Sequence, residues 1–264
     1  MRLRFASLVA VLVLTTACID SIDVPNGRFG TIAAAALDNG GGGYVMDPEA
    51  AFYGETDLGY TPFPNDTCIV LAYSNVTTVN SSLVTLNAGD RLFTSVSGRV
   101  DTLVPIPGIN IRVYTPVRTN GIPFIPGDTL SITVPGTASG FPASAISVRT
   151  AEPFTHSAIG IPGENQPLTV TWTPAPAPGS QMTFSLRYAN ATSTAGLNEQ
   201  VFCSFNDDGA AVIGADYLNG WRTALNDQRS TRAVRIRSRE VLVDTRTKLS
   251  VISSFAQPLP VFVP

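Results

Sequence analysis

The sequence is poor in the side chains that most often carry out catalysis. Among its 264 residues there is one histidine, His156, and one lysine, Lys248, and charged residues make up only 14%. Common zinc sites need several His or Cys ligands, which a single histidine and scattered cysteines do not supply. No Gly-x-Ser-x-Gly motif accompanies His156. We therefore predict a protein that is not an enzyme and holds no metal or other cofactor.

Basic charge is also scarce. The formal net charge is −3 at pH 7, so generic attraction to nucleic acid is not expected. Hydrophobic residues make up 44%, which is enough to bury a core, and the twenty prolines exclude long helices. A pair of carboxylates far apart in the sequence, as glycosidases use, stays open as an alternative because no pair stands out among the acids.

The amino terminus has the pattern of an export signal. Arg2 and Arg4 precede an apolar run over residues 5–14, which is too short to span a bilayer as a helix. The next residues, Leu14-Thr15-Thr16-Ala17-Cys18, resemble the lipobox of bacterial lipoproteins, although Thr15 occupies the place that usually holds Leu. The resemblance implies cleavage after residue 17 and acylation of Cys18. Ordinary signal cleavage, which would give a soluble secreted product, is the alternative.

The cysteine count agrees with this interpretation. Lipidation of Cys18 leaves Cys68 and Cys203 as an even pair in an oxidising compartment, and we predict a disulfide between them that joins the two halves of the chain. Ile19 stands where an inner-membrane retention signal of some bacteria has Asp. We therefore expect the outer membrane rather than the inner membrane.

The rest of the chain alternates short β-rich runs with turns rich in Gly, Pro, Asn and Asp, a pattern typical of β-sandwiches. We predict an all-β, antiparallel β-sandwich of two packed immunoglobulin-like lobes with at most one short helix, near residues 217–226. The predicted strands are residues 28–37, 67–73, 82–86, 91–96, 99–104, 110–115, 129–134, 145–150, 232–243 and 247–255.

A weak internal echo joins residues 89–96 to residues 127–134. In both segments a Gly-Asp turn begins a strand whose apolar residues lie two apart. Two related hairpins would explain the echo, and a chance recurrence of Gly-Asp at strand starts explains it equally well.

The clearest alternation lies in the C-terminal half. Leu168, Val170 and Trp172 share one face of a predicted strand, and a second set, Met182, Phe184, Leu186 and Tyr188, follows a turn. The pattern predicts a hairpin with one buried and one wet face. The Trp and the later strand bearing Cys203 resemble an immunoglobulin-type sandwich, but this half contains no second cysteine.

We accordingly divide the chain into five segments. They are a signal peptide (1–17), a lipid tether and Gly-rich linker (18–47), an N-terminal β-sandwich (48–155), a C-terminal immunoglobulin-like β-sandwich (156–258) and a tail (259–264).

Few residues are candidates for binding. Arg235, Arg237 and Arg239 alternate along one strand and form a possible patch for anionic ligands, or else a solvated sheet face. Tyr217 and Trp221 are possible aromatic contacts for a sugar or a partner. Asp207 and Asp208 lack EF-hand spacing and are interpreted as a solvated turn.

These observations favour a non-enzymatic cell-envelope lipoprotein with a structural or partner-binding role. Its expected partners are the membrane, through the lipid anchor, and an envelope protein or a glycan. The alternative is a carbohydrate-binding or carbohydrate-active exported protein.

Overall fold

The computed structural model describes residues 27–54, 65–72, 84–106, 112–189, 197–225 and 229–262. The predicted signal peptide and Cys18 lie outside these residues. The described chain is an all-β sandwich, as predicted from the sequence. It divides into two compact units, and each is described here by itself. Unit 1 is drawn from Met1–Phe63, Asn80–Ala151 and Arg237–Phe255, and unit 2 from Pro64–Val79, Glu152–Ile236 and Ala256–Pro264.

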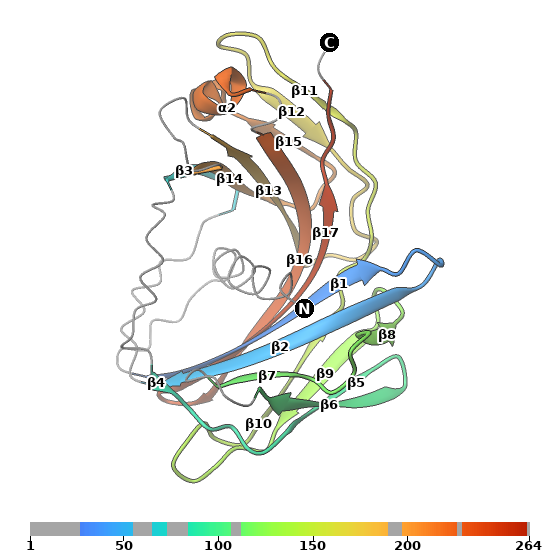
Figure 1. Cartoon of the computed structure of the whole chain (residues 1–264), viewed down its shortest axis with the longest axis vertical. Coiled ribbons are helices and arrows are strands. Elements are labelled where there is room, and N and C mark those ends of the chain that lie inside the picture. Colours follow the sequence, from blue (N-terminus) through green and yellow to red (C-terminus); the bar gives the residue numbers. More distant parts are fainter. Residues whose placement is uncertain are drawn as a thin grey trace. The chain divides into compact units, whose positions relative to one another are not determined.

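Unit 1 is built on one continuous path of paired strands (Figure 1). Its strand order is β10-β9-β5-β6-β7-β2-β1-β17, and β4 and β8 also pair with β2. Strand β1 pairs in parallel with β17, so the sheet is mixed rather than purely antiparallel. The strands are β1 (Arg28–Asp38), β2 (Tyr44–Gly54), β4 (Val84–Thr85), β5 (Leu92–Val96), β6 (Arg99–Pro105), β7 (Val113–Pro116), β8 (Ile122–Phe124), β9 (Thr129–Val134), β10 (Ser144–Arg149) and β17 (Thr247–Pro258).

The predicted tether is wrong over its described part, because β1 and β2 form a long antiparallel hairpin in unit 1. The glycine run lies in the turn between them, where Gly40 and Gly42 have φ values of 75° and 77°. Only a residue without Cβ adopts this backbone readily. Strand β2 passes through Pro48, which lies between the segment paired with β8 and the segment paired with β7. Pro48, which has no N–H to donate, stands opposite Ala34 in the ladder with β1, at a point where the other neighbour of β2 changes.

The core of unit 1 is aromatic. Phe52 on β2 packs edge-on against Tyr114, with ring centroids 5.7 Å apart, and in a tilted arrangement against Phe141, with centroids 4.6 Å apart. Gly30 on β1 lies so close that a Cβ there would come within 2.9 Å of Phe52, Phe141 and Leu249. The Tyr114 hydroxyl is buried but bonded, since it donates to Gly89 O (2.8 Å) and accepts from Ala88 N (2.9 Å).

The sequence echo corresponds to two hairpins. Strands β5 and β6 form one, β9 and β10 form the other, and β5 pairs with β9. Gly89 and Gly127 both have positive φ, at 117° and 89°. Glycine adopts such a backbone without steric cost, which explains why each Gly-Asp pair begins with glycine.

Unit 2 contains a sheet in which β16, β13, β14 and β3 follow one another, and two short pairs, β12 with β15 and β11 with β18. Its elements are β3 (Thr67–Ala72), β11 (Ile159–Gly160), β12 (Leu168–Thr171), β13 (Ser180–Tyr188), β14 (Glu199–Asn206), β15 (Ala210–Ile213), η2 (Ala215–Tyr217), α2 (Asn219–Thr223) and β18 (Val261–Phe262). Strand β16 (Arg229–Asp244), like β17, carries residues of both units.

The predicted hairpin of the C-terminal half is wrong in its pairing. Strand β12 pairs with β15, and β13 pairs with β14. The inward sets are confirmed, because Leu168, Val170, Trp172 and all four apolar residues of β13 are buried. However, Thr183 and Ser185 are buried as well, so the middle of β13 is covered on both faces. The predicted tail also contains structure, since Val261 in β18 pairs with Ile159.

The predicted disulfide is present. Cys68 on β3 and Cys203 on β14 lie directly opposite each other in neighbouring strands, with their Cα atoms 4.1 Å apart. Both belong to unit 2, so the bond closes within one unit instead of joining two halves. The bridge lies within one sheet, which differs from the inter-sheet bridge of an immunoglobulin domain.

The predicted short helix is α2, preceded by the 3-10 turn η2. Trp221 and Leu218 are fully buried there. Gly220 is required by close packing, because a Cβ at this position would lie 2.5 Å from the Tyr188 hydroxyl. No helix within the described residues is long and apolar enough to cross a membrane.

Candidate functional site

The predicted arginine patch does not exist as an exposed surface. Arg235 and Arg237 are buried, with 1% and 3% of their surface exposed, and only Arg239 is exposed. Arg235 belongs to unit 2, whereas the other two belong to unit 1. A terminal guanidinium nitrogen of Arg239 lies 3.4 Å from both the carbonyl oxygen and the hydroxyl oxygen of Ser147 on β10.

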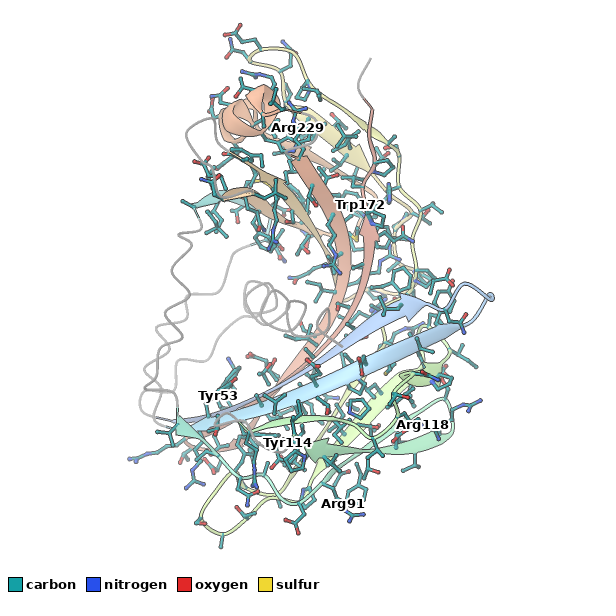
Figure 2. The ribbon with its side chains drawn as sticks, in the orientation of Figure 1. Tyr53, Arg91, Tyr114, Arg118, Trp172 and Arg229 are labelled. Carbon is teal, nitrogen blue, oxygen red and sulfur yellow. A yellow bond between two sulfur atoms is a disulfide. The ribbon has the colours of Figure 1, made fainter. Side chains whose placement is uncertain are left out.

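The two aromatic candidates also differ from each other. Trp221 is fully buried and lies under the Arg229 guanidinium, whose Cζ is 5.5 Å from the ring centroid. It is therefore part of the core and cannot contact a ligand. Tyr217 remains exposed, at 37%. Trp172 is buried, as the sequence predicts (Figure 2).

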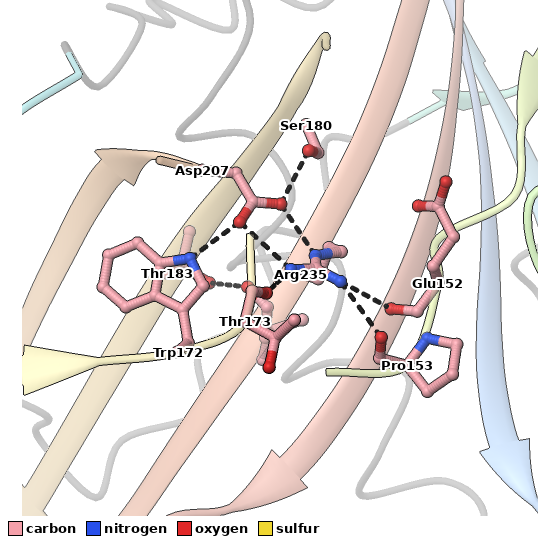
Figure 3. A network of polar contacts seen from close by, with 9 residues as sticks. Glu152, Pro153, Trp172, Thr173, Ser180, Thr183, Asp207 and Arg235 are labelled. Carbon is pink, nitrogen blue, oxygen red and sulfur yellow. Dashed lines mark hydrogen bonds and ion pairs between the residues drawn. The ribbon is translucent and has the colours of Figure 1, made fainter. Parts of the chain in front are cut away.

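The most concentrated polar chemistry of the described chain is an ion pair inside unit 2. Asp207 follows β14 in a turn, and Arg235 lies on β16 (Figure 3). Arg235 Nε donates to Asp207 Oδ2 at 2.7 Å, and a terminal nitrogen donates to Oδ1 at 3.1 Å. This is the bidentate geometry that guanidinium and carboxylate favour.

Asp207 is further satisfied by two neutral donors. Trp172 Nε1 donates to Oδ1 at 2.7 Å, and the Ser180 hydroxyl donates to Oδ2 at 2.6 Å. Each carboxylate oxygen thus accepts two hydrogen bonds, which fills its usual capacity. The interpretation of Asp207 as a solvated turn residue is wrong, because its side chain is only 2% exposed.

The remaining Arg235 donors bind main-chain carbonyls. One terminal nitrogen donates to Pro153 O at 3.1 Å and to Glu152 O at 3.4 Å, and the other donates to Thr173 O. All five guanidinium N–H groups therefore have acceptors. The guanidinium also lies over the Phe154 ring, with Cζ 5.2 Å from its centroid.

A network so completely paired has a positioning role. It holds the segment at residues 152–154, the end of β12 and the turn at Asp207 against β16. Burying two charges is costly, and the cost is offset only when their hydrogen bonds are complete, as they are here. No donor or acceptor of this described pair is left for a substrate, so we assign the network to stability and not to catalysis.

Sequence reasoning missed this network for a physical reason. The alternating arginines of β16 have the period of an exposed charged face, and the partner carboxylate lies 28 residues earlier in the chain. The available signal was Trp172, a predicted core residue whose indole N–H needs an acceptor when it is buried.

His156 has no catalytic arrangement in the described structure. Its ring is half-buried, and Nδ1 lies 3.2 Å from the carbonyl of Ser157. The neighbouring Ser157 hydroxyl bonds instead to the Thr171 hydroxyl, at 2.7 Å. Residues 156 and 172 form an isolated bridge, which gives the histidine segment a place beside β12.

Unit 1 contains a second ion pair, which uses the single lysine. Lys248 Nζ lies 2.6 Å from Glu240 Oε2, and the two side chains are 8% and 12% exposed. Among the described residues, no group of three or more His, Cys, Asp or Glu side chains is placed to hold a metal ion.

Comparison of the sequence with models of known protein families gives no match, and comparison with curated proteins gives none.

Proposed function

We propose that this protein is a non-enzymatic lipoprotein of the cell envelope, with a structural or partner-binding role. The observation that carries the proposal is the amino-terminal sequence, in which a basic and apolar leader is followed by a lipobox-like segment ending in Cys18. Acylation there would hold the β-sandwich at a membrane, and the outer membrane is the preferred one because Ile19 follows the cysteine.

The disulfide supports export. Cys68 and Cys203 are bonded to each other, which is typical of proteins that mature in an oxidising compartment. The pair accounts for every cysteine except Cys18, so an unacylated product that retained residue 18 would carry an odd thiol.

The use of polar groups supports a structural role. The two buried ion pairs are satisfied within their own units, and the Asp207–Arg235 network serves the packing of unit 2.

Metabolic labelling with palmitate tests the anchor. We expect label in the wild-type protein and none in Cys18→Ser, with the wild-type protein in the membrane fraction. Thr15→Leu restores the usual lipobox residue and should increase acylation. A wild-type protein without label, or equal label in Cys18→Ser, would contradict the proposal.

Most of the residues that suggest the carbohydrate-related alternative are buried. Trp221 and two of the three arginines that motivated it are buried in the described structure. Hydrolysis of a panel of polysaccharides is the test of an enzymatic version, and product release by the wild-type protein would contradict the non-enzymatic proposal.

A further inference from the structure

One sheet face of unit 1 has the composition of a binding surface. It consists of the outward residues of β10, β9, β5 and β6, which are neighbours in that order. Along β5 and β9 the burial alternates strictly, so every second side chain points to solvent. Serine and threonine are the commonest residue types among these outward residues, and we call the set the hydroxyl face. Its hydroxyl groups are those of Ser95, Thr102, Thr129, Ser131, Thr133 and Ser147.

The register arranges these hydroxyls in rows across the strands. Ser95 on β5 lies opposite Ser131 on β9, and Ser131 lies opposite Ser147 on β10. Neighbouring strands are roughly 4.8 Å apart, so each row is a regular line of hydroxyl groups. Such a line can donate to and accept from a polymer that itself carries many hydroxyl groups.

An exposed aromatic ring lies within this face. Phe93 on β5 is 42% exposed and is flanked in register by Thr102 on β6 and Thr133 on β9. Val100, opposite Ser95, is 69% exposed. The π-face of an aromatic ring is electronegative and attracts C–H groups, which is how a flat ring stacks on a sugar.

The charge on this face has one sign. In the described strands, none of the outward positions is Asp or Glu, although the chain as a whole has a net charge of −3. Arg91 and Arg149 occupy outward positions, and Arg91 lies at the periphery of unit 1 (Figure 2). A third guanidinium, that of Arg239, contacts Ser147 at the edge strand β10.

Three acids lie close to the face but not at its outward strand positions, and one of them, Asp90, is exposed beside Arg91. Asp101 on β6 forms an ion pair with Arg118, and Asp128, which precedes β9, accepts a hydrogen bond of 2.7 Å from Ser97. The charged side chains at the outward strand positions are therefore all arginines, and their sign complements a polyanion.

We propose that the hydroxyl face binds an acidic polysaccharide. The polymer lies across the strands, with one sugar stacked on Phe93, its hydroxyls bonded to the Ser and Thr rows, and its anionic groups paired with Arg91 and Arg239. This inference deepens the partner-binding role proposed above. It does not involve Cys18, so the absence of glycan binding would leave the result of the acylation test unchanged.

Calorimetric titration of the full chain with polygalacturonate, and with dextran as the neutral control, tests the proposal. We expect binding of polygalacturonate that weakens as salt is added, and much weaker binding of dextran. Phe93→Ala should weaken binding by at least about tenfold, whereas Phe93→Tyr, which keeps an aromatic ring, should retain it. Arg91→Gln should weaken binding by several-fold.

Two matched controls lie outside the face. Val84→Ala removes apolar surface from an exposed residue of β4, which pairs with β2, and Arg246→Gln removes one positive charge from the exposed turn between β16 and β17. Both should bind as the wild type does. Circular dichroism of each variant confirms that the fold is retained.

Several outcomes would overturn the proposal. They are equal binding of the two polymers, wild-type affinity in Phe93→Ala, or an equal loss in the control variants. Sedimentation that shows a dimer abolished by Phe93→Ala would assign the face to a second copy of the chain. Flotation with anionic vesicles, in the absence of polygalacturonate binding, would assign it to lipid.

Discussion

Arg235 and Asp207 lie 28 residues apart in the sequence and form an ion pair whose side chains are 1% and 2% exposed. All of their hydrogen-bonding groups are used, by each other, by Trp172 and Ser180, and by three main-chain carbonyls. The pair connects β16 to segments of unit 2 that share no ladder with it.

Arg235→Ala should strongly destabilise the protein. It leaves Asp207 buried without its counter-charge and frees three carbonyls, and breaking one partner of a buried pair costs about 3–5 kcal/mol of unfolding free energy. Urea denaturation measures this loss. Arg246→Ala, at an exposed turn residue, should change stability by less than about 0.5 kcal/mol. An Arg235→Ala protein as stable as this control would contradict the assignment.

Gly220→Ala should destabilise the protein although alanine is the better helix former by about 1 kcal/mol. The new Cβ would overlap the Tyr188 ring, and overpacking of this kind costs typically about 1–3 kcal/mol. Gly160→Ala is the matched control, because nothing lies within 4 Å of a Cβ at that position. In a Tyr188→Ala background the cost of Gly220→Ala should vanish, and a cost that persists there would refute the contact as its cause.

Loss of the disulfide should also destabilise the chain. The bond joins residues separated by 135 positions, and closing so long a loop contributes about 4–5 kcal/mol in the chain-entropy model. Comparison of wild type with Cys68→Ala/Cys203→Ala by urea denaturation measures the effect. Reducing agent should lower wild-type stability and leave the double variant unchanged, whereas an equal response in both would show that the bond is absent.

Stability at alkaline pH should depend on Tyr188. Burial raises the pKa of this phenol above its ordinary value of 10.0, and a hydrogen bond and the negative charge of Glu199 raise it further. The phenol of Tyr188 therefore ionises at a lower pH in the unfolded chain than in the folded chain. The contribution of neutral Tyr188 to the unfolding free energy is fully present below about pH 10 and is lost as the pH rises further. Between about pH 9 and about pH 12 the unfolding free energy of Tyr188→Phe should decline less steeply than that of wild type. Parallel curves would argue against the shift.

Local patterning predicts much of the strand content. Period-two alternation locates β9 at Thr129–Val134 and places Trp172 in the core, because both depend on neighbouring residues. The cysteine count, in turn, predicts the disulfide. Strand β2 escapes the same reasoning. Pro48 and the preceding glycines are typical of a linker, yet Pro48 lies within β2, opposite Ala34 of β1, where the described partner on the other side of β2 changes from β8 to β7.

Pairing and charge placement are not available from local pattern. Alternation along β12 and β13 shows which side chains point inward but not which strand lies beside them, so the predicted hairpin is wrong. Similarly, Arg235 and Arg239 belong to the same alternating set of arginines on β16, although Arg235 is buried and Arg239 is exposed. The difference depends on Asp207, which reaches the strand only through the tertiary fold.

The proposal that this protein is anchored by lipid is tested most directly by mass spectrometry of the amino-terminal peptide of the protein isolated from its native membranes. We predict a peptide that begins at Cys18 and carries the mass of a diacylglycerol group. A peptide that begins at another residue without added lipid, or an intact leader that includes Met1, would contradict it.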